Sequence, residues 1–234
     1  MVRVVAGIAL MLAGACSPAW AQERNFTVTV KGNLTSESTL YTSVKTATSE
    51  TREAAVSFEN LYGFGVEVKY LFPGSRVALG LGAEYIRTRL ETPLKVSFAN
   101  PIPSSDGFSV IPIELTGYFI IPASGQSFKI FMGGGVGVYL GERTYTVAGV
   151  EAVSERNNVG GGIHVLAGVN YVLTDRISLL AEMKFRDAKF ESSTRFPTDQ
   201  IRYQGLLIPV SSVPSQVRVQ TDGIVFQVGV GYSF

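Results

Sequence analysis

The 234-residue sequence contains one cysteine, one histidine and one tryptophan. A single cysteine, Cys16, excludes an internal disulfide, and one histidine with one cysteine is too few for the ligand sets of zinc sites. We therefore expect no metal and no other cofactor. Charged residues make up only 17% of the chain and the net charge is +1. This balance argues against nucleic-acid binding, which needs a basic surface.

Long apolar runs are also missing. The chain is 46% hydrophobic, yet no stretch after the N-terminal region approaches the roughly 20 consecutive apolar residues of a membrane helix. The apolar side chains must therefore fill a soluble core or alternate along strands that face lipid.

Residues 1–21 have the features of a cleaved secretory signal peptide. A positive residue and a short apolar run precede Ala19 and Ala21, which fit a signal-peptidase site. The run is too short for a membrane anchor, and lipidation at Cys16 is the alternative. The sequence predicts an exported chain with a signal peptide at 1–21 and one domain at 22–234.

From Phe26 onward, β-branched and aromatic residues alternate with turn residues, which predicts strands throughout. The segment 224–234 is the clearest, because its even positions are all apolar and its odd positions are mostly small or polar. A segment at 111–121 is noisier because Pro112 interrupts it. The same two-residue period recurs in segments 62–72, 77–86, 128–140, 162–171 and 177–186.

Short and long connections alternate between these segments. Three short turns, at 72–75, 122–127 and 174–176, are built from turn residues. Four longer, mostly polar segments lie near 42–55, 93–107, 148–157 and 191–216. This alternation predicts an all-β fold, an eight-stranded antiparallel up-and-down transmembrane β-barrel with both chain ends beside the short turns.

The two faces of the predicted strands differ in charge. One face carries almost no charge over the roughly nine to eleven residues that a tilted strand needs to cross hydrocarbon. We expect this face to point to lipid, and the sheet to close, because lipid cannot satisfy unpaired backbone groups. Aromatic residues gather at both ends of the apolar faces, as in interfacial girdles. They are Tyr70, Phe72, Phe119, Phe128, Tyr171, Tyr232 and Phe234 near the turns, and Tyr62, Tyr85 and Phe185 near the long segments.

Beyond these girdles the pattern inverts without a change of phase. After Tyr85, for example, Arg87 points outward, whereas Ile86 and Leu90 point inward. The residues after Phe185 show the same inversion. We infer that the barrel projects from the membrane as a water-facing sheet with a small apolar core of its own.

The C-terminal residues resemble the terminal strand by which the bacterial barrel-assembly machinery recognises its clients. The resemblance assigns an assembly signal to Phe226, Val228, Val230, Tyr232 and Phe234. Over about residues 26–234 the chain is similar to the small eight-stranded barrels of the OmpA transmembrane-domain, OmpX, OmpW and opacity-protein superfamily. The runs 160–162 and 171–176 match its Gly-rich strand and short turn. This resemblance implies the Gram-negative outer membrane, with short turns in the periplasm and long loops outside.

Polar positions of the inward face form a predicted lumen network near mid-depth: Glu84, Glu114, His164, Glu182, Lys184, Arg186 and Gln227. Opposite charges at one level should pair, because an unpaired buried charge is costly. The pairs either form a structural plug or act as a gate that opens when they exchange. Many inward positions are glycines, which either make room for long side chains or leave a cavity.

His164, the one histidine, is aimed at the lumen and has no companion serine motif, so we expect no catalysis. Two long segments carry conspicuous apolar residues, which mark either a partner surface or extensions of the projecting sheet. They are Val96, Phe98, Ile102, Leu206, Leu207, Ile208, Val210 and Val213.

Our first hypothesis is a non-enzymatic outer-membrane barrel with a structural or surface-interaction role through its outer loops. The second is a narrow channel for small hydrophobic molecules, which similarity to OmpW-like barrels implies. It is motivated by the apolar interior above the membrane and the glycine-lined lumen. The third and weakest is a lipid-A-modifying enzyme. We expect a monomer whose partners are outer-membrane lipid and lipopolysaccharide, the assembly machinery during biogenesis, and an extracellular ligand or small hydrophobic molecule, with no nucleic acid.

Overall fold

The computed structural model describes residues 24–41, 55–91, 93, 101–123, 125, 127–154, 158–210, 212 and 215–234. The predicted signal peptide at 1–21, with the alternative lipidation site at Cys16, lies outside the described residues. So do three of the apolar loop residues, Val96, Phe98 and Val213. In the described part of the chain, no helix is long and apolar enough to cross a membrane.

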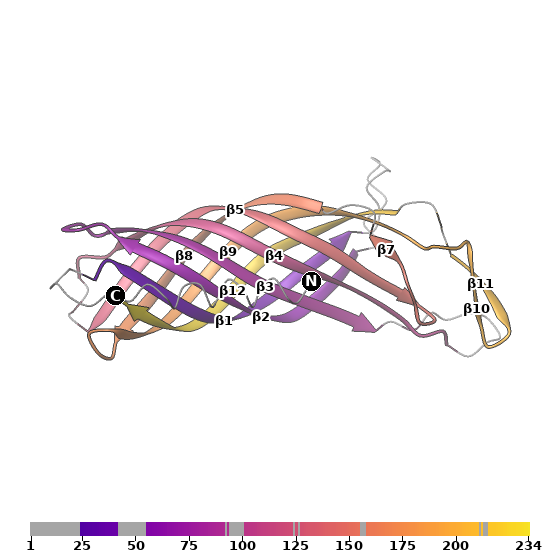
Figure 1. Ribbon diagram of the computed structural model, residues 1–234, viewed down its shortest axis with the longest axis horizontal. Helices are drawn as coiled ribbons and strands as arrows, with labels where there is room; N and C mark the ends of the chain where they lie inside the picture. The colour runs from indigo at the N-terminus through magenta and orange to yellow at the C-terminus, as the bar shows by residue number, and fades with distance from the viewer. Residues whose placement is uncertain are drawn as a thin grey trace.

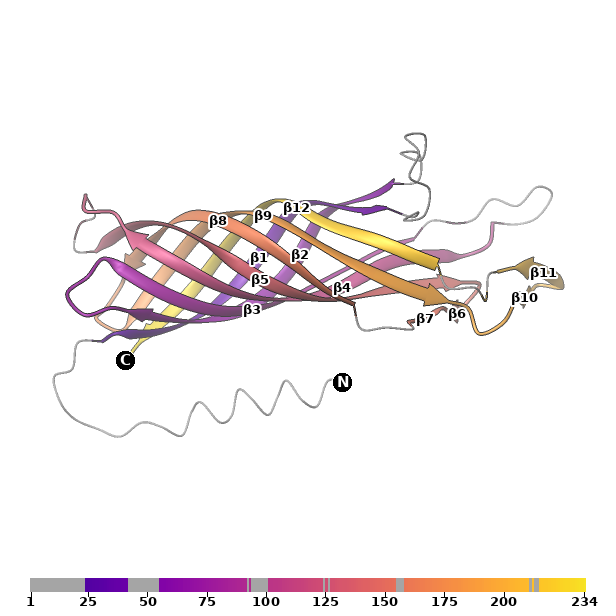
Figure 2. The same cartoon turned by 90° about the horizontal axis from the view of Figure 1, so that it is seen from above.

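Eight long strands form the framework of the fold. They are β1 (Phe26–Tyr41), β2 (Ala55–Leu71), β3 (Val77–Glu91), β4 (Ser104–Ile120), β5 (Phe128–Val147), β8 (Asn158–Val172), β9 (Ile177–Arg195) and β12 (Ser215–Ser233). Each pairs antiparallel with the next, and β12 pairs with both β9 and β1, so the sheet closes. The result is an elongated barrel of tilted strands (Figures 1 and 2). The predicted eight-stranded antiparallel fold is confirmed.

Four short strands lie at the loop-side end of the barrel (Figure 2). β6 (Val150–Glu151) pairs with β5, and β7 (Val153–Ser154) pairs with β9. β10 (Gln200–Tyr203) and β11 (Leu206–Pro209) form a hairpin of their own. Its two turn residues, Gln204 and Gly205, both have positive φ, at 49° and 83°. Such values are typical of the tight turns whose twist matches a two-stranded hairpin.

Two of the predicted long segments are shorter than expected. β4 already begins at Ser104, inside the predicted segment 93–107, and β9 continues to Arg195, inside 191–216. The cause is the extension of both strands past the apolar face: β4 stays paired with β5, and β9 with β12, almost to the ends of these strands. Polar composition alone does not distinguish a loop from a water-facing sheet.

Pro112 does not interrupt its strand, contrary to the sequence prediction. β4 runs through it, and Pro112 stays in register with Tyr139 of β5. On the β3 side, the paired positions jump from Ala83↔Ile113 to Ile86↔Val110. Because proline has no N–H to donate, the sheet loses a few steps of pairing on that side and keeps its register.

The outward face of the barrel is apolar, as the two-residue period predicts. Tyr62 is 72% exposed and Val228 is 66% exposed, whereas their chain neighbours Leu61 and Gln227 are buried. All five residues of the predicted assembly signal point outward. Their recognition by the assembly machinery stays a prediction. An apolar belt on a closed sheet is the surface that a barrel presents to lipid.

The inversion near the loops is confirmed by a buried apolar core inside the upper barrel, here called the upper core. It comprises Leu61, Ile86, Phe108, Val110, Tyr139, Ala188, Phe190 and Val219. One residue departs from the prediction: Leu90, expected to point into this core, is 40% exposed. It lies next to the end of β3, beyond the buried inward residue Ile86, so the core does not reach it.

A second apolar core, the loop core, lies beyond the upper core and includes Ile102, Val147 and Ile208. Val210 packs against it. By contrast, Leu206 and Leu207 of the β10–β11 hairpin are 45% and 58% exposed. Ile102, Ile208 and Val210 therefore extend the core, whereas Leu206 and Leu207 are exposed. That the exposed pair marks a partner surface stays a prediction.

Candidate functional site

The lumen gathers the polar side chains that the sequence predicted. All seven predicted network residues are buried there. They come from β3, β4, β8, β9 and β12, because every second residue of each strand points inward. The structure divides them between two charge clusters rather than one layer. The strands that carry the clusters run between the short turns and the long loops.

The loop-side cluster comprises Asn33, Glu84, Glu114, Lys184, Arg186 and Gln227. Lys184 Nζ lies 2.8 Å from Glu84 Oε1 and 2.7 Å from Glu114 Oε2. Arg186 Nη2 lies 2.7 Å from Glu84 Oε2, and Arg186 Nε lies 3.0 Å from Glu114 Oε1. Two cations thus bridge the same two carboxylates, and the four charges cancel.

Neutral donors complete the hydrogen bonding of these carboxylates. Asn33 Nδ2 donates to Glu84 Oε2 at 3.0 Å, and Gln227 Nε2 donates to Glu84 Oε1 at 2.8 Å. The Tyr139 hydroxyl donates to Glu114 Oε1 at 2.6 Å. Three of the four carboxylate oxygens of Glu84 and Glu114 therefore have two partners each. The fourth, Glu114 Oε2, has the Lys184 ammonium. Buried ion pairs are favourable only with geometry of this quality.

The turn-side cluster comprises Lys31, Glu67, Lys69, Tyr118 and Glu182. Lys31 Nζ lies 2.6 Å from Glu67 Oε2 but 3.6 Å from Glu182 Oε2. The Tyr118 hydroxyl donates to Glu67 Oε1. Lys69 Nζ lies over the Tyr118 ring, 3.8 Å from its centroid. Neither carboxylate oxygen of Glu182 accepts a hydrogen bond from a described residue.

This division corrects the prediction of a single mid-depth layer. Glu182 lies one inward position nearer the turn than Lys184 on β9, and it faces Lys31 rather than the loop-side cluster. Neighbouring strands tilt and stagger in a barrel, so counting residues from the turns places side chains only to within a step or two.

His164 lies in the lumen beside the loop-side cluster. Its Nε2 is 2.9 Å from Thr116 Oγ1, and its Nδ1 is 4.0 Å from Glu114 Oε1. A hydroxyl, an imidazole and a carboxylate in this order resemble a catalytic triad. All three side chains are buried, however, and the cavity that borders Thr116 and Glu114 measures only about 20 Å³. That volume holds about one water molecule and no substrate.

The inward glycines make room for the clusters. A methyl group on Gly65 would lie 2.8 Å from Glu84 Cγ, and one on Gly80 would lie 2.5 Å from Glu67 Oε1. Contacts this close exclude a side chain unless a neighbour moves. Of the two interpretations left open by the sequence, close packing holds at these positions.

Between the upper core and the loop core, Asp106 of β4 and Arg143 of β5 form a partly buried ion pair. Arg143 Nε lies 2.9 Å from Asp106 Oδ1, and Arg143 Nη2 lies 2.5 Å from Asp106 Oδ2, a bidentate contact. The guanidinium carbon lies 4.7 Å from the centroid of the Tyr145 ring. Burial raises the pKa of the Tyr145 hydroxyl above its usual value. This pair lies in the part of the barrel that projects beyond the apolar belt.

The sequence analysis missed several members of the two clusters. Asn33 and Lys31 lie on β1, whose pattern is too weak to assign an inward face. Tyr118 and Tyr139 were not assigned to the predicted network, although their hydroxyls reach Glu67 and Glu114. An available signal was the charge balance of the inward face, because each buried acid needs a cation at its level.

Comparison with known proteins agrees with this architecture. The sequence profile of the family described as outer membrane protein beta-barrel domain matches residues 7–234. No curated protein matches the chain. The solved structure of OprG from Pseudomonas aeruginosa superposes with a TM-score of 0.55 at 14% identity, covering 91% of this chain and 97% of OprG.

Two further barrels are similar over most of their lengths. Neisserial surface protein A, NspA, gives a TM-score of 0.47 at 14% identity, covering 89% of this chain and 97% of NspA. Ail of Yersinia pestis gives 0.43 at 12% identity, covering 91% of this chain and 100% of Ail. At these identities the structural likeness concerns the fold alone, and the match of the family profile supplies the assignment. The chain belongs to the outer membrane protein β-barrel domain family of the bacterial outer membrane.

Proposed function

We propose that this protein is a closed, non-enzymatic barrel that acts through its loop-side surface, in envelope structure or surface interaction. The observation that carries the proposal is the filling of the lumen. From turns to loops, the barrel interior holds a small apolar cluster around Phe131 and Leu166, then the turn-side and loop-side charge clusters, then the upper core. A passage would have to break several of these levels at once.

The loop-side surface exposes apolar residues on a part of the barrel that packed cores support. The strands extend past the apolar belt, and two packed cores support them there. The β10–β11 hairpin projects from this end (Figure 2) and exposes Leu206 and Leu207 beside its tight turn. Exposed neighbouring apolar residues on a supported surface are typical of contact sites. Short turns face the periplasm in outer-membrane barrels, so the loop-side end faces the cell exterior.

A narrow channel for small hydrophobic molecules is the alternative. The glycine-rich inward face that motivated it is filled by the clusters, and the apolar upper interior is a packed core. The alternative would therefore require the loop-side cluster to open as a gate.

Single-channel recording of the refolded protein in a planar bilayer tests the proposal. A closed barrel should give a silent trace while its folded state is confirmed by its shifted gel mobility. Reproducible conductance steps that change when Glu182 or Arg186 is replaced would overturn the proposal and make the charge clusters a gate.

A further inference from the structure

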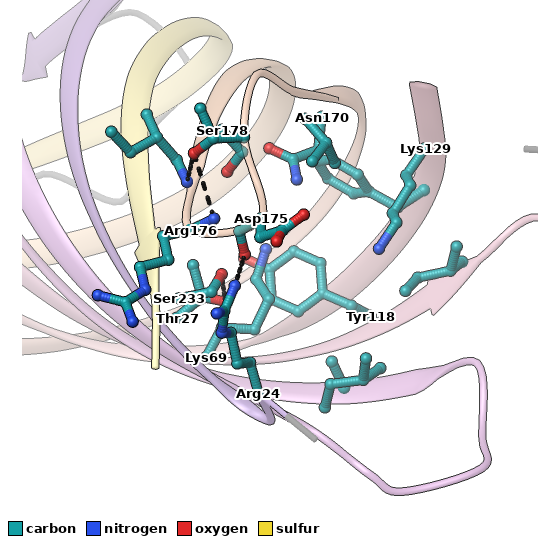
Figure 3. Close-up of a pocket in the computed structure, with 17 residues that line it drawn as sticks. Arg24, Thr27, Lys69, Tyr118, Lys129, Asn170, Asp175, Arg176, Ser178 and Ser233 are labelled. Carbon is teal, nitrogen blue, oxygen red and sulfur yellow. Dashed lines mark hydrogen bonds between the residues drawn. The ribbon is translucent and has the colours of Figure 1, made fainter. Parts of the chain in front are cut away.

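A pocket of about 250 Å³ opens at the turn-side mouth of the barrel (Figure 3). Its walls come from Arg24, the turn-side ends of all eight long strands, and the turn between β8 and β9. Leu71, Ile120 and Val172 are among the apolar residues that line it. Apolar walls around a partly enclosed site strengthen the electrostatic interactions inside it.

Four cationic side chains line this pocket: Arg24, Lys69, Lys129 and Arg176. Among the described residues, Asp175 is the one acidic side chain in the lining. Arg24 Nη1 donates to the backbone carbonyl of Asp175 at 2.5 Å, which leaves the guanidinium charge uncompensated by that contact. The described lining therefore carries an excess of positive charge, which gives the pocket a positive potential.

Two of the cations lie outside ion-pair distance of every described carboxylate. Neither Lys69 nor Lys129 forms an ion pair with a described carboxylate. Lys69 instead places its ammonium over the rings of Tyr118 and Phe131, 3.8 and 5.0 Å from their centroids. Lys69 belongs to the turn-side cluster, so the pocket begins where that cluster ends. Glu67 and Glu182 attract this ammonium without contacting it, so it keeps N–H donors to offer a ligand.

We propose that this pocket binds a phosphate group, with Lys69 and Lys129 as its principal ligands and Arg24 and Arg176 at the rim. A phosphate dianion matches several convergent cations better than a carboxylate does, and lysine and arginine are its usual protein ligands. The phosphate belongs either to a small periplasmic solute or to the headgroup of an inner-leaflet lipid. The site lies at the opposite end of the barrel from the proposed interaction surface and does not depend on it.

The test is an NMR titration of the ¹⁵N-labelled, refolded barrel with sodium phosphate. The protein is held in maltoside micelles, because phosphocholine detergents carry phosphate themselves, and sodium chloride keeps the ionic strength constant. Backbone amides of the 173–176 turn should shift saturably. The double variant Lys69→Gln/Lys129→Gln should weaken binding roughly tenfold, as expected when two partly exposed charge contacts are lost.

Controls separate charge loss from misfolding and identify the source of the phosphate. Lys189→Gln removes an exposed cation at the other end of the barrel and should bind like the wild type. Lys129→Gln alone keeps the lumen contacts of Lys69 and should still weaken binding. If the turn amides shift in phosphatidylglycerol nanodiscs, and not in those of the double variant, the source is a lipid headgroup. Equal binding by the wild type and the double variant, or no saturable shift in either medium, would overturn the proposal.

Discussion

The two charge clusters of the lumen both combine glutamates with basic side chains, but their hydrogen bonds and ion pairs are satisfied to different degrees. In the loop-side cluster, Lys184 and Arg186 each contact both Glu84 and Glu114 at 2.7–3.0 Å. In the turn-side cluster, Glu182 has one cation at 3.6 Å and no hydrogen bond from a described residue, and Lys69 rests on aromatic rings. In the loop-side cluster the charged groups satisfy one another. In the turn-side cluster some donors and acceptors are left without a hydrogen bond from a described residue.

We infer that the two clusters have different roles along the barrel axis. A set of mutually satisfied charges gains little from any ligand, so it suits a structural plug. A set with uncommitted groups, next to an open pocket, suits binding. The contrast can be tested by substitutions that should affect one cluster far more than the other.

The largest effect is expected from Arg186→Met. Methionine fills part of the space but leaves Glu84 and Glu114 with Lys184 as their one shared cation, so an excess negative charge stays buried. Removing one partner of a buried ion pair costs about 3–5 kcal/mol. Equilibrium unfolding in urea, in vesicles of defined lipid composition, should show a loss of this size in the free energy of unfolding.

The matched control is Arg218→Gln. Arg218 Nη2 lies 2.9 Å from Glu191 Oε1, a distance similar to those in the loop-side cluster, but both side chains are exposed. Exposed pairs contribute about 0–1 kcal/mol, so the control should lose little stability. Equal losses for the two variants would show that burial does not set the strength of the loop-side cluster.

The strands and their faces were predictable from the sequence because a two-residue period is strictly tied to side-chain direction. The apolar belt, the closing strand at 224–234 and the inward placement of Arg186 all follow from that rule. The start of β4 at Ser104 was not predicted, because a water-facing sheet and a loop share a polar composition.

The contacts inside the lumen were only partly predictable. The sequence places Glu182 and Lys184 on the same inward face, but the stagger between strands decides that one meets Lys31 and the other meets Glu84. Register is a property of strand pairs, and a single strand's pattern does not contain it. The role of the Tyr139 hydroxyl was hidden for the same reason.

An intermediate effect is expected from adding a methyl group beside each cluster. In Gly65→Ala, the new methyl meets Glu84 Cγ at 2.8 Å and a backbone oxygen at 2.9 Å, and Glu84 is held by four partners. Overpacking of this kind costs about 1–3 kcal/mol. In Gly80→Ala, the methyl meets the carboxylate end of Glu67 and the ring of Tyr118 in the less constrained cluster.

The loss of stability in urea should therefore be larger for Gly65→Ala than for Gly80→Ala. Both glycines point inward, so lipid contacts are unchanged by either substitution. The opposite order would mean that the turn-side cluster, and not the loop-side cluster, is the more rigid of the two.

The smallest effect is expected from Glu182→Gln, and it is the most discriminating. The substitution keeps the shape of the side chain and removes a buried charge that accepts no hydrogen bond from a described residue, while Lys31 keeps Glu67 at 2.6 Å. The desolvation relieved offsets the lost attraction to Lys31, so the free energy of unfolding should change by less than about 1 kcal/mol. Glu84→Gln makes the same chemical change where two cations and two amides converge, and should cost at least about 2 kcal/mol more. Similar losses for both would mean that Glu182 is as firmly committed as Glu84, and the turn-side cluster would then have no bonding capacity to offer a ligand.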